Sequence, residues 1–306
     1  MLPPEQLSTT DDRRPTTNTE SHARARLLVL AGAVLLSTGG AAIKLCGLSS
    51  WQVASFRSGI AALVLLWLAP AARRDFDRSA LLAGSAYAAT MILFVLGNKA
   101  TTAANTIFLQ STAPLYILLL APWLLHEPAR RSDLLVMATM AVGLTLFFVG
   151  EQPSFASAPE PMRGNFLAAL AGVTWGLTVM AVRWMSRDPH RNVGAMLITG
   201  NALACVIALP FALPVHGATA ADWAVVAYLG VVQIALAYLL VSAGMRHLTA
   251  LEAMLMLLLE PVLNPLWAGV IQGERPNGWA LIGGAVVLIG TVVNGLRANR
   301  SLVAGR

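Results

Sequence analysis

Glu260 is the residue whose chemistry stands out most against its surroundings. It lies inside the apolar run LEAMLMLLLEPVLNPLWAGVIQG, with no lysine or arginine nearby in sequence. An ionisable group inside such a run is costly and is usually kept for a function. Three roles are open to it: holding the ammonium group of a ligand, carrying a coupling proton, or remaining a neutral acid that is hydrogen-bonded within its helix.

Arg57 is the one cation placed well inside an apolar run. It could bind the carboxylate of a ligand, or it could belong to a fixed structural pair or bond carbonyl groups at a helix end. The sequence alone leaves both roles open. Lys44 and Lys99 lie near the ends of their runs, where a long side chain can extend its ammonium group to water, and we expect both to do so.

A face of aromatic and polar side chains is predicted on the third apolar run. Residues 87, 91, 94 and 98 are spaced by four, three and four, which places them on one side of a helix. An apolar cavity with a few polar groups is typical of a ligand site, whereas small polar residues also hold membrane helices together. As a set we predict a substrate cavity lined by Ser37, Tyr87, Met91, Phe94, Asn98, Gln110, Trp175, Thr178, Tyr238, Ser242, Met256 and Glu260.

Pro114 and Pro261 fall near the middle of two apolar runs. Each removes a backbone hydrogen bond and clashes with the preceding turn. In a bilayer such a break persists where neighbouring groups or a cavity satisfy the freed carbonyl. We predict a kink at each proline, which either takes part in a conformational change or only shapes the packing.

The elements that must position these residues are membrane-spanning helices. Hydrophobic residues make up 57% of the 306 residues, charged residues make up 12%, and the mean hydropathy is +0.67. About 20 apolar residues cross a bilayer. The sequence therefore predicts an all-α polytopic membrane protein with ten transmembrane helices. They are expected at 26–46, 50–70, 79–98, 102–122, 132–150, 163–183, 193–213, 221–244, 248–271 and 277–297.

The loop charges predict the orientation of these helices. With the N-terminus inside, 16 lysines and arginines fall on the inner side and 4 on the outer side. Positive residues collect in cytoplasmic loops, so both termini are expected in the cytoplasm. This use of the basic residues also argues against nucleic-acid binding, despite a pI near 10. Cys46 and Cys205 match no metal-binding spacing and are expected to be small apolar packing residues.

An internal repeat divides the chain. Shifting the sequence by 147 residues superposes Gly97 on Gly244, Pro114 on Pro261, Glu127 on Glu274 and Gly143 on Gly290. Each half then holds five helices, an odd number, so the halves are expected to be inverted, as in many secondary transporters. The predicted organisation is a disordered tail (1–25), two five-helix repeats (26–150 and 163–297), an outer linker (151–162) and a second tail (298–306).

Several of these features resemble the EamA-type exporters of the drug/metabolite transporter superfamily. They are Pro114 with the following HEP, Glu260-Pro261 with the following GER, Trp175-Gly176, and the run FRSGIAALVLL at 56–66. The second repeat departs from the first because GER lacks the proline of HEP. The resemblance also implies an arginine on the second helix, at the edge of the cavity, so it favours the structural role for Arg57.

The resemblance implies a non-enzymatic exporter in a bacterial inner membrane, working by alternating access through a central cavity. Among the members of this superfamily, the chain is most similar to the exporters of aromatic amino acids. The implied partners are a small-molecule substrate and the lipid bilayer, with no nucleic acid, cofactor or metal, and a monomer suffices. The alternatives are a multidrug or cation exporter and a membrane scaffold without transport.

Overall fold

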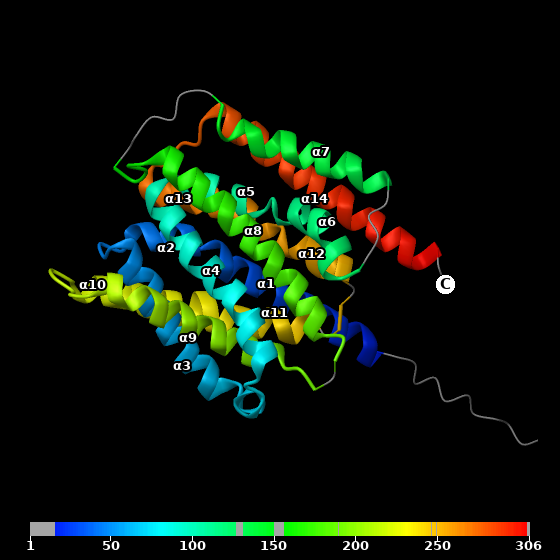
Figure 1. Cartoon of the computed structure of the whole chain (residues 1–306), viewed down its shortest axis with the longest axis horizontal. Coiled ribbons are helices and arrows are strands. Elements are labelled where there is room, and N and C mark those ends of the chain that lie inside the picture. Colours follow the sequence, from blue (N-terminus) through cyan, green and yellow to red (C-terminus); the bar gives the residue numbers. More distant parts are fainter. Residues whose placement is uncertain are drawn as a thin grey trace, which may run out of the picture.

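The computed structural model describes residues 16–126, 131–149, 156–188, 190–245, 247–248 and 250–304. These ranges contain helices and their connections, with no β-strand. The helices run back and forth across a bundle, and both ends of the described chain lie on the same side of it (Figure 1). The expected all-helical fold is confirmed.

Helices follow the predicted apolar runs, and several runs are divided into two or three segments. The segments are α1 (Thr16–Ser37), α2 (Gly39–Leu45), α3 (Ser50–Leu68), η1 (Pro70–Arg74), α4 (Arg78–Ala100), α5 (Ala103–Gln110), α6 (Ala113–Leu124), α7 (Arg131–Leu146), α8 (Pro161–Met185), α9 (Val193–Ala212), α10 (Ala220–Tyr228), η2 (Leu229–Leu236), α11 (Ala237–Met245), α12 (Ala250–Leu257), α13 (Leu259–Gln272) and α14 (Gly278–Ala304).

Helix α1 begins earlier than the sequence predicts. The expected tail covers residues 1–25, yet α1 starts at Thr16, and residues 1–15 lie outside the described part of the chain. The stretch TTNTESHA is polar, so it carries no signal of a membrane helix. A helix satisfies its own backbone hydrogen bonds whatever its side chains, which allows α1 to continue past the apolar run.

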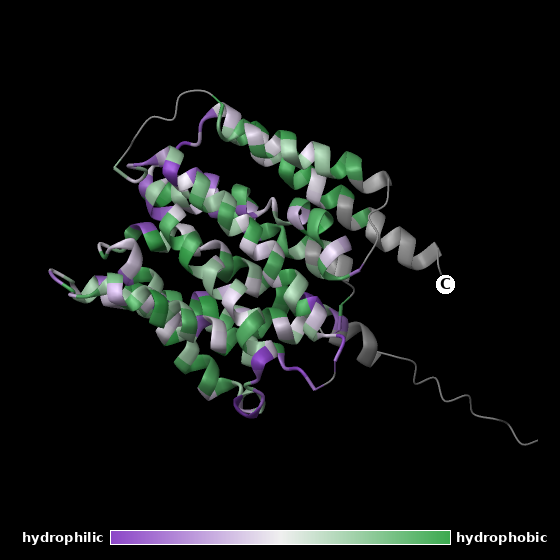
Figure 2. Cartoon of the chain, viewed as in Figure 1, coloured by the Kyte–Doolittle hydropathy of each residue, from purple (hydrophilic) through white to green (hydrophobic). Residues whose placement is uncertain are grey.

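Eight helical stretches in the described ranges are long and apolar enough to cross a membrane. They comprise α1–α2, α3, α4, α5–α6, α8, α9, α10–α11 and part of α12–α13. Two further apolar helices, Leu134–Leu146 and Gly278–Val293, are shorter. Apolar residues cover the helices, whereas hydrophilic residues gather at the ends of the bundle (Figure 2). Trp123 and Val270 are 83% and 82% exposed, as expected for side chains that face lipid. The chain is a multi-pass membrane protein.

Helix contacts bring together segments that lie far apart in sequence. Helix α4 packs on α8 and α9, α3 packs on α9, α1 packs on α11, and α7 packs on α14. Glycines allow some of these helices to approach closely. A Cβ atom on Gly200 of α9 would lie 2.8 Å from the carbonyl oxygen of Gly84 on α4. On α14, a Cβ on Gly283 would lie 2.7 Å from the oxygen of Gly143. Such small-residue seams are common between membrane helices.

Two spans are interrupted just before their central prolines. Helix α5 ends at Gln110 and α6 resumes at Ala113, so Pro114 is the second residue of α6. Helix α12 ends at Leu257 and α13 resumes at Leu259, so Pro261 is the third residue of α13. Proline fits the first turn of a helix because the N–H groups there have no partner inside the helix. Both spans therefore place the start of a helix within the membrane.

Candidate functional site

Arg57 reaches from α3 to α4. Its side chain is buried, with the residue only 1% exposed. Nη2 donates to the carbonyl oxygen of Met91 at 3.1 Å and lies 3.9 Å from the Met91 sulfur, whereas Nε has no hydrogen-bond partner. In the described part of the chain, no carboxylate lies within ion-pair distance of Arg57. The bond to a carbonyl agrees with the structural role that the family resemblance implies, but the guanidinium has no counter-charge among the described residues.

Two tyrosines and Glu260 extend this group. Tyr87, one turn before Met91 on α4, meets Tyr238 of α11 edge to face, with ring centroids 5.8 Å apart. Tyr238 is in electrostatic range of both Arg57 and Glu260. Side chains from α3, α4, α11 and α13 are therefore within electrostatic range of one tyrosine pair, and they include a cation and a carboxylate.

Glu260 lies in the first turn of α13 and is half-buried. Among the described residues, no lysine or arginine nitrogen is within 4 Å of its carboxylate. The N–H groups at the start of a helix carry a partial positive charge, which favours a carboxylate at this position. The break before Pro261 thus supplies a local reason why a carboxylate is tolerated inside the membrane.

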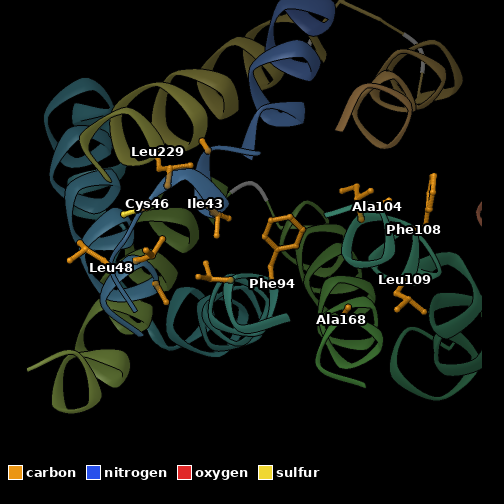
Figure 3. Close-up of a cluster of buried hydrophobic side chains, with 14 of the residues drawn as sticks. Ile43, Cys46, Leu48, Phe94, Ala104, Phe108, Leu109, Ala168 and Leu229 are labelled. Carbon is orange, nitrogen blue, oxygen red and sulfur yellow. The ribbon is translucent and has the colours of Figure 1, made fainter. Parts of the chain in front are cut away.

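The structure distributes the other predicted cavity residues over several environments. Phe94 belongs to a buried hydrophobic cluster and points between the helices that carry Ile43 and Ala104 (Figure 3). Asn98 is fully buried, and neither atom of its amide has a partner. Ser242 is exposed. The remaining members are buried or half-buried: Trp175 packs against the hydrophobic cluster that contains Met91, Thr178 contacts Thr90, and Gln110 and Met256 are half-buried.

A pocket of about 440 Å³ lies elsewhere, beside the break between α1 and α2. The Trp267 indole donates to Ser37 at 2.9 Å, and the hydroxyl groups of Thr38 and Tyr228 share a hydrogen bond of 2.8 Å. None of the predicted cavity residues lines this pocket. Its lining is mostly apolar and consists of Thr38, Ala41, Ala42, Leu45, Ala224, Val225, Tyr228, Trp267 and Ile271.

At the end of the bundle away from the described chain ends, a buried ion pair joins three segments. Lys44 of α2 lies 2.9 Å from Glu274 in the α13–α14 connection, and each side chain is only 2% exposed. Lys44 also donates to the carbonyl oxygens of Thr101 and Ser157. The other Glu274 oxygen accepts from the backbone N–H of Ala103 at 2.8 Å, which caps the start of α5.

The expectation that Lys44 reaches water is therefore wrong. Its ammonium group instead turns inward because a carboxylate and two carbonyl groups lie within reach. Lys99 also bonds a backbone carbonyl, that of Cys46, rather than extending freely. The sequence pattern marked Glu274 through the repeat but gave no sign of its partner, which is 230 residues away.

The connection after α2 is held from further directions. The backbone N–H of Gly47 donates to Asp222 of α10 at 2.5 Å, and the Gln272 amide donates to the carbonyl of Ala41 at 2.8 Å. Cys46 and Cys205 are both free thiols, and burial raises the pKa of the Cys46 thiol. Within the described ranges, this end of the bundle is closed by polar contacts among α2, α5, α10 and the α13–α14 connection.

Comparisons with known proteins agree with this architecture. An uncharacterised transporter of Archaeoglobus fulgidus is 25% identical over 206 residues, covering 67% of this chain and 71% of that protein. The aromatic amino acid exporter YddG of Ancylobacter novellus is 27% identical over 188 residues, covering 61% of this chain and 65% of the exporter. One solved crystal structure has the same fold, with a TM-score of 0.59 and 22% identity over 88% of this chain and 97% of its own.

The family model for EamA-like transporters matches this chain twice, at residues 23–149 and 162–296. The two matches together include every residue of the Arg57–Glu260 group and of the buried ion pair. Members of this family are transporters rather than enzymes. The chain belongs to the EamA-like transporter family, within the drug/metabolite transporter superfamily.

Proposed function

We propose that this protein exports amino acids with aromatic or otherwise hydrophobic side chains, or closely related metabolites, across a bacterial inner membrane. The observation that carries the proposal is the grouping of Arg57, Tyr87, Tyr238 and Glu260 within the spans. Separate positive and negative groups beside aromatic rings suit a ligand with an ammonium group, a carboxylate and an apolar body. The exporter named among the relatives carries substrates of this kind.

A second candidate is an exporter of hydrophobic cations. It is favoured by Glu260, which has no cationic partner among the described residues. Such a substrate would need Glu260 and the aromatic rings but would have no use for Arg57. The two candidates therefore differ in whether the substrate must carry a carboxylate.

We propose ten spans arranged as two inverted halves, with both termini in the cytoplasm. The helix contacts support this arrangement because they recur after a shift of five spans: α4 packs on α8 as α11 packs on α1. The interruptions support it as well, since Ser111 after α5 and Leu258 after α12 are 147 residues apart. In this arrangement the Lys44–Glu274 pair closes the outer end, and alternating access requires the pair to open.

Cysteine labelling tests the inversion. We expect His126→Cys and Arg275→Cys to react with a membrane-impermeant maleimide from opposite sides, the first from the cytoplasm and the second from outside. Both native residues are exposed at the ends of their spans. Each is introduced into a Cys46→Ala, Cys205→Ser background. Labelling of both sites from the same side would overturn the inverted arrangement.

A further inference from the structure

The buried guanidinium of Arg57 has unused hydrogen-bonding capacity. Besides Nε of Arg57, the hydroxyl group of Ser58 is buried and has no partner, and the buried Tyr87 hydroxyl has Tyr238 and Asn201 nearby but no hydrogen bond of normal length. Buried polar groups are nearly always hydrogen-bonded, and a buried charge is costly unless it is paired. The unsatisfied Nε of Arg57, in electrostatic range of Tyr87 on the neighbouring helix α4, therefore indicates a place for an additional acceptor.

The chemistry of these groups selects an anion. A guanidinium offers only donors, and its planar fork matches a carboxylate. Tyr87 can add a hydroxyl donor, and it lies in electrostatic range of Arg57. Glu260 does not fill this place, because the described structure has no ion pair between Glu260 and Arg57. Tyr238 instead interacts with both of them.

The helical segment that packs on α3 beside Arg57 is locally irregular. The π-helical segment η2 (Leu229–Leu236) ends one residue before α11, which carries Tyr238 on its first turn. Such segments are rare and often occur at functional sites. Gly230 in η2 packs against Arg57, since a Cβ there would lie 2.7 Å from the Arg57 carbonyl oxygen. A small change in the winding of η2 would therefore move the Tyr238 ring relative to Arg57 and Tyr87.

We infer that Arg57 and Tyr87 form a subsite for the carboxylate of the substrate, opposite Glu260, so that the substrate is a zwitterionic α-amino acid. The inference rests on the proposed function and refines it. Tyr238 is in electrostatic range of both charged residues, and Arg57 is buried in this structure. Substrate without a carboxylate would leave the guanidinium unpaired and would bind weakly.

The test compares three probes in purified protein: phenylalanine, phenethylamine, which lacks the carboxylate, and 3-phenylpropionate, which lacks the ammonium group. Their apparent affinities are measured as inhibition of labelled phenylalanine counterflow and as thermal stabilisation. For the wild type, we expect phenylalanine to bind about 10- to 100-fold more tightly than phenethylamine, as for the loss of one hydrogen-bonded charge. In Arg57→Gln this difference disappears while phenethylamine affinity stays within about twofold, because phenethylamine has no carboxylate for the guanidinium to bind.

Arg74→Gln removes an exposed arginine and serves as the matched control that should keep the preference. Equal weakening of both probes in a folded Arg57→Gln protein would assign Arg57 a purely structural role. If that variant fails to fold, the wild-type probe series still decides, because equal affinity for phenylalanine and phenethylamine overturns the subsite. If the protein transports phenylalanine but binds phenethylamine equally well, the subsite is contradicted and the proposed function is not. If the protein exchanges amines but no amino acid, the proposed function is contradicted.

Discussion

Replacing Lys44 with methionine is expected to lower the free energy of unfolding by about 3–5 kcal/mol, the cost of breaking a buried ion pair from one side. Glu274 would then be a buried carboxylate whose remaining bond is to the Ala103 N–H. Glu274→Gln should cost less, because the amide oxygen can still accept from Ala103. The double variant should recover part of the loss, since no charge remains buried.

The measurement is a double-mutant cycle of Lys44→Met and Glu274→Gln by thermal unfolding in detergent. A coupling energy of about 1 kcal/mol or more is expected for residues in direct contact. The same variants should also open the outer end. Thr106→Cys, buried one turn below Ala103, should react faster with an impermeant maleimide from outside in the Lys44→Met background. Additive energies together with unchanged labelling would show that the pair does not close this end.

Glu260→Gln is expected to reduce transport of the preferred amino acid by about 10- to 100-fold, which corresponds to losing one hydrogen bond to a charged group. It should also remove the part of the pH dependence that arises from titration of this carboxylate. The reason is its position: the group lies at a helix start within the membrane and has no ion-pair partner among the described residues.

Initial rates of counterflow measured between about pH 5 and pH 8 provide the readout. Glu160→Gln is the matched control, because Glu160 is an exposed carboxylate paired with Arg163 at the end of α8. We expect this control to behave like the wild type. Wild-type rates and pH dependence in Glu260→Gln would remove Glu260 from the transport mechanism.

Features that depend on local sequence were well predicted. Runs of apolar residues indicated the helices, because a span must be apolar along its length wherever it meets lipid. Pro114 and Pro261 indicated the two interruptions, because proline constrains the backbone of its own turn. The break at Thr38 is harder to see. The carbonyl of Leu36 accepts from Gln233 of η2, a contact almost 200 residues away in sequence.

Features that depend on which helices meet were not predictable from the sequence. Lys44 lies near the end of its apolar run, so its side chain was expected to reach water. The folded chain instead brings Glu274 next to Lys44. The family resemblance implies that Arg57 lies at the edge of the cavity, yet Arg57 lies beside Tyr87 and Met91, two of the predicted cavity residues. Helical spacing shows which side chains share a face, but not which face it meets across the bundle. Ser242, for example, shares a face with Tyr238 and is nevertheless exposed.

The central claim is that this member of the EamA-like family moves amino acids with hydrophobic side chains across the membrane. Counterflow by the purified wild-type protein in liposomes tests it most directly. Vesicles loaded with unlabelled substrate are diluted into labelled phenylalanine, with quaternary amines and nucleosides as competing classes. The account predicts transient accumulation of labelled phenylalanine that other aromatic and hydrophobic amino acids suppress. Accumulation of a quaternary amine or nucleoside, with none of any amino acid, would contradict it.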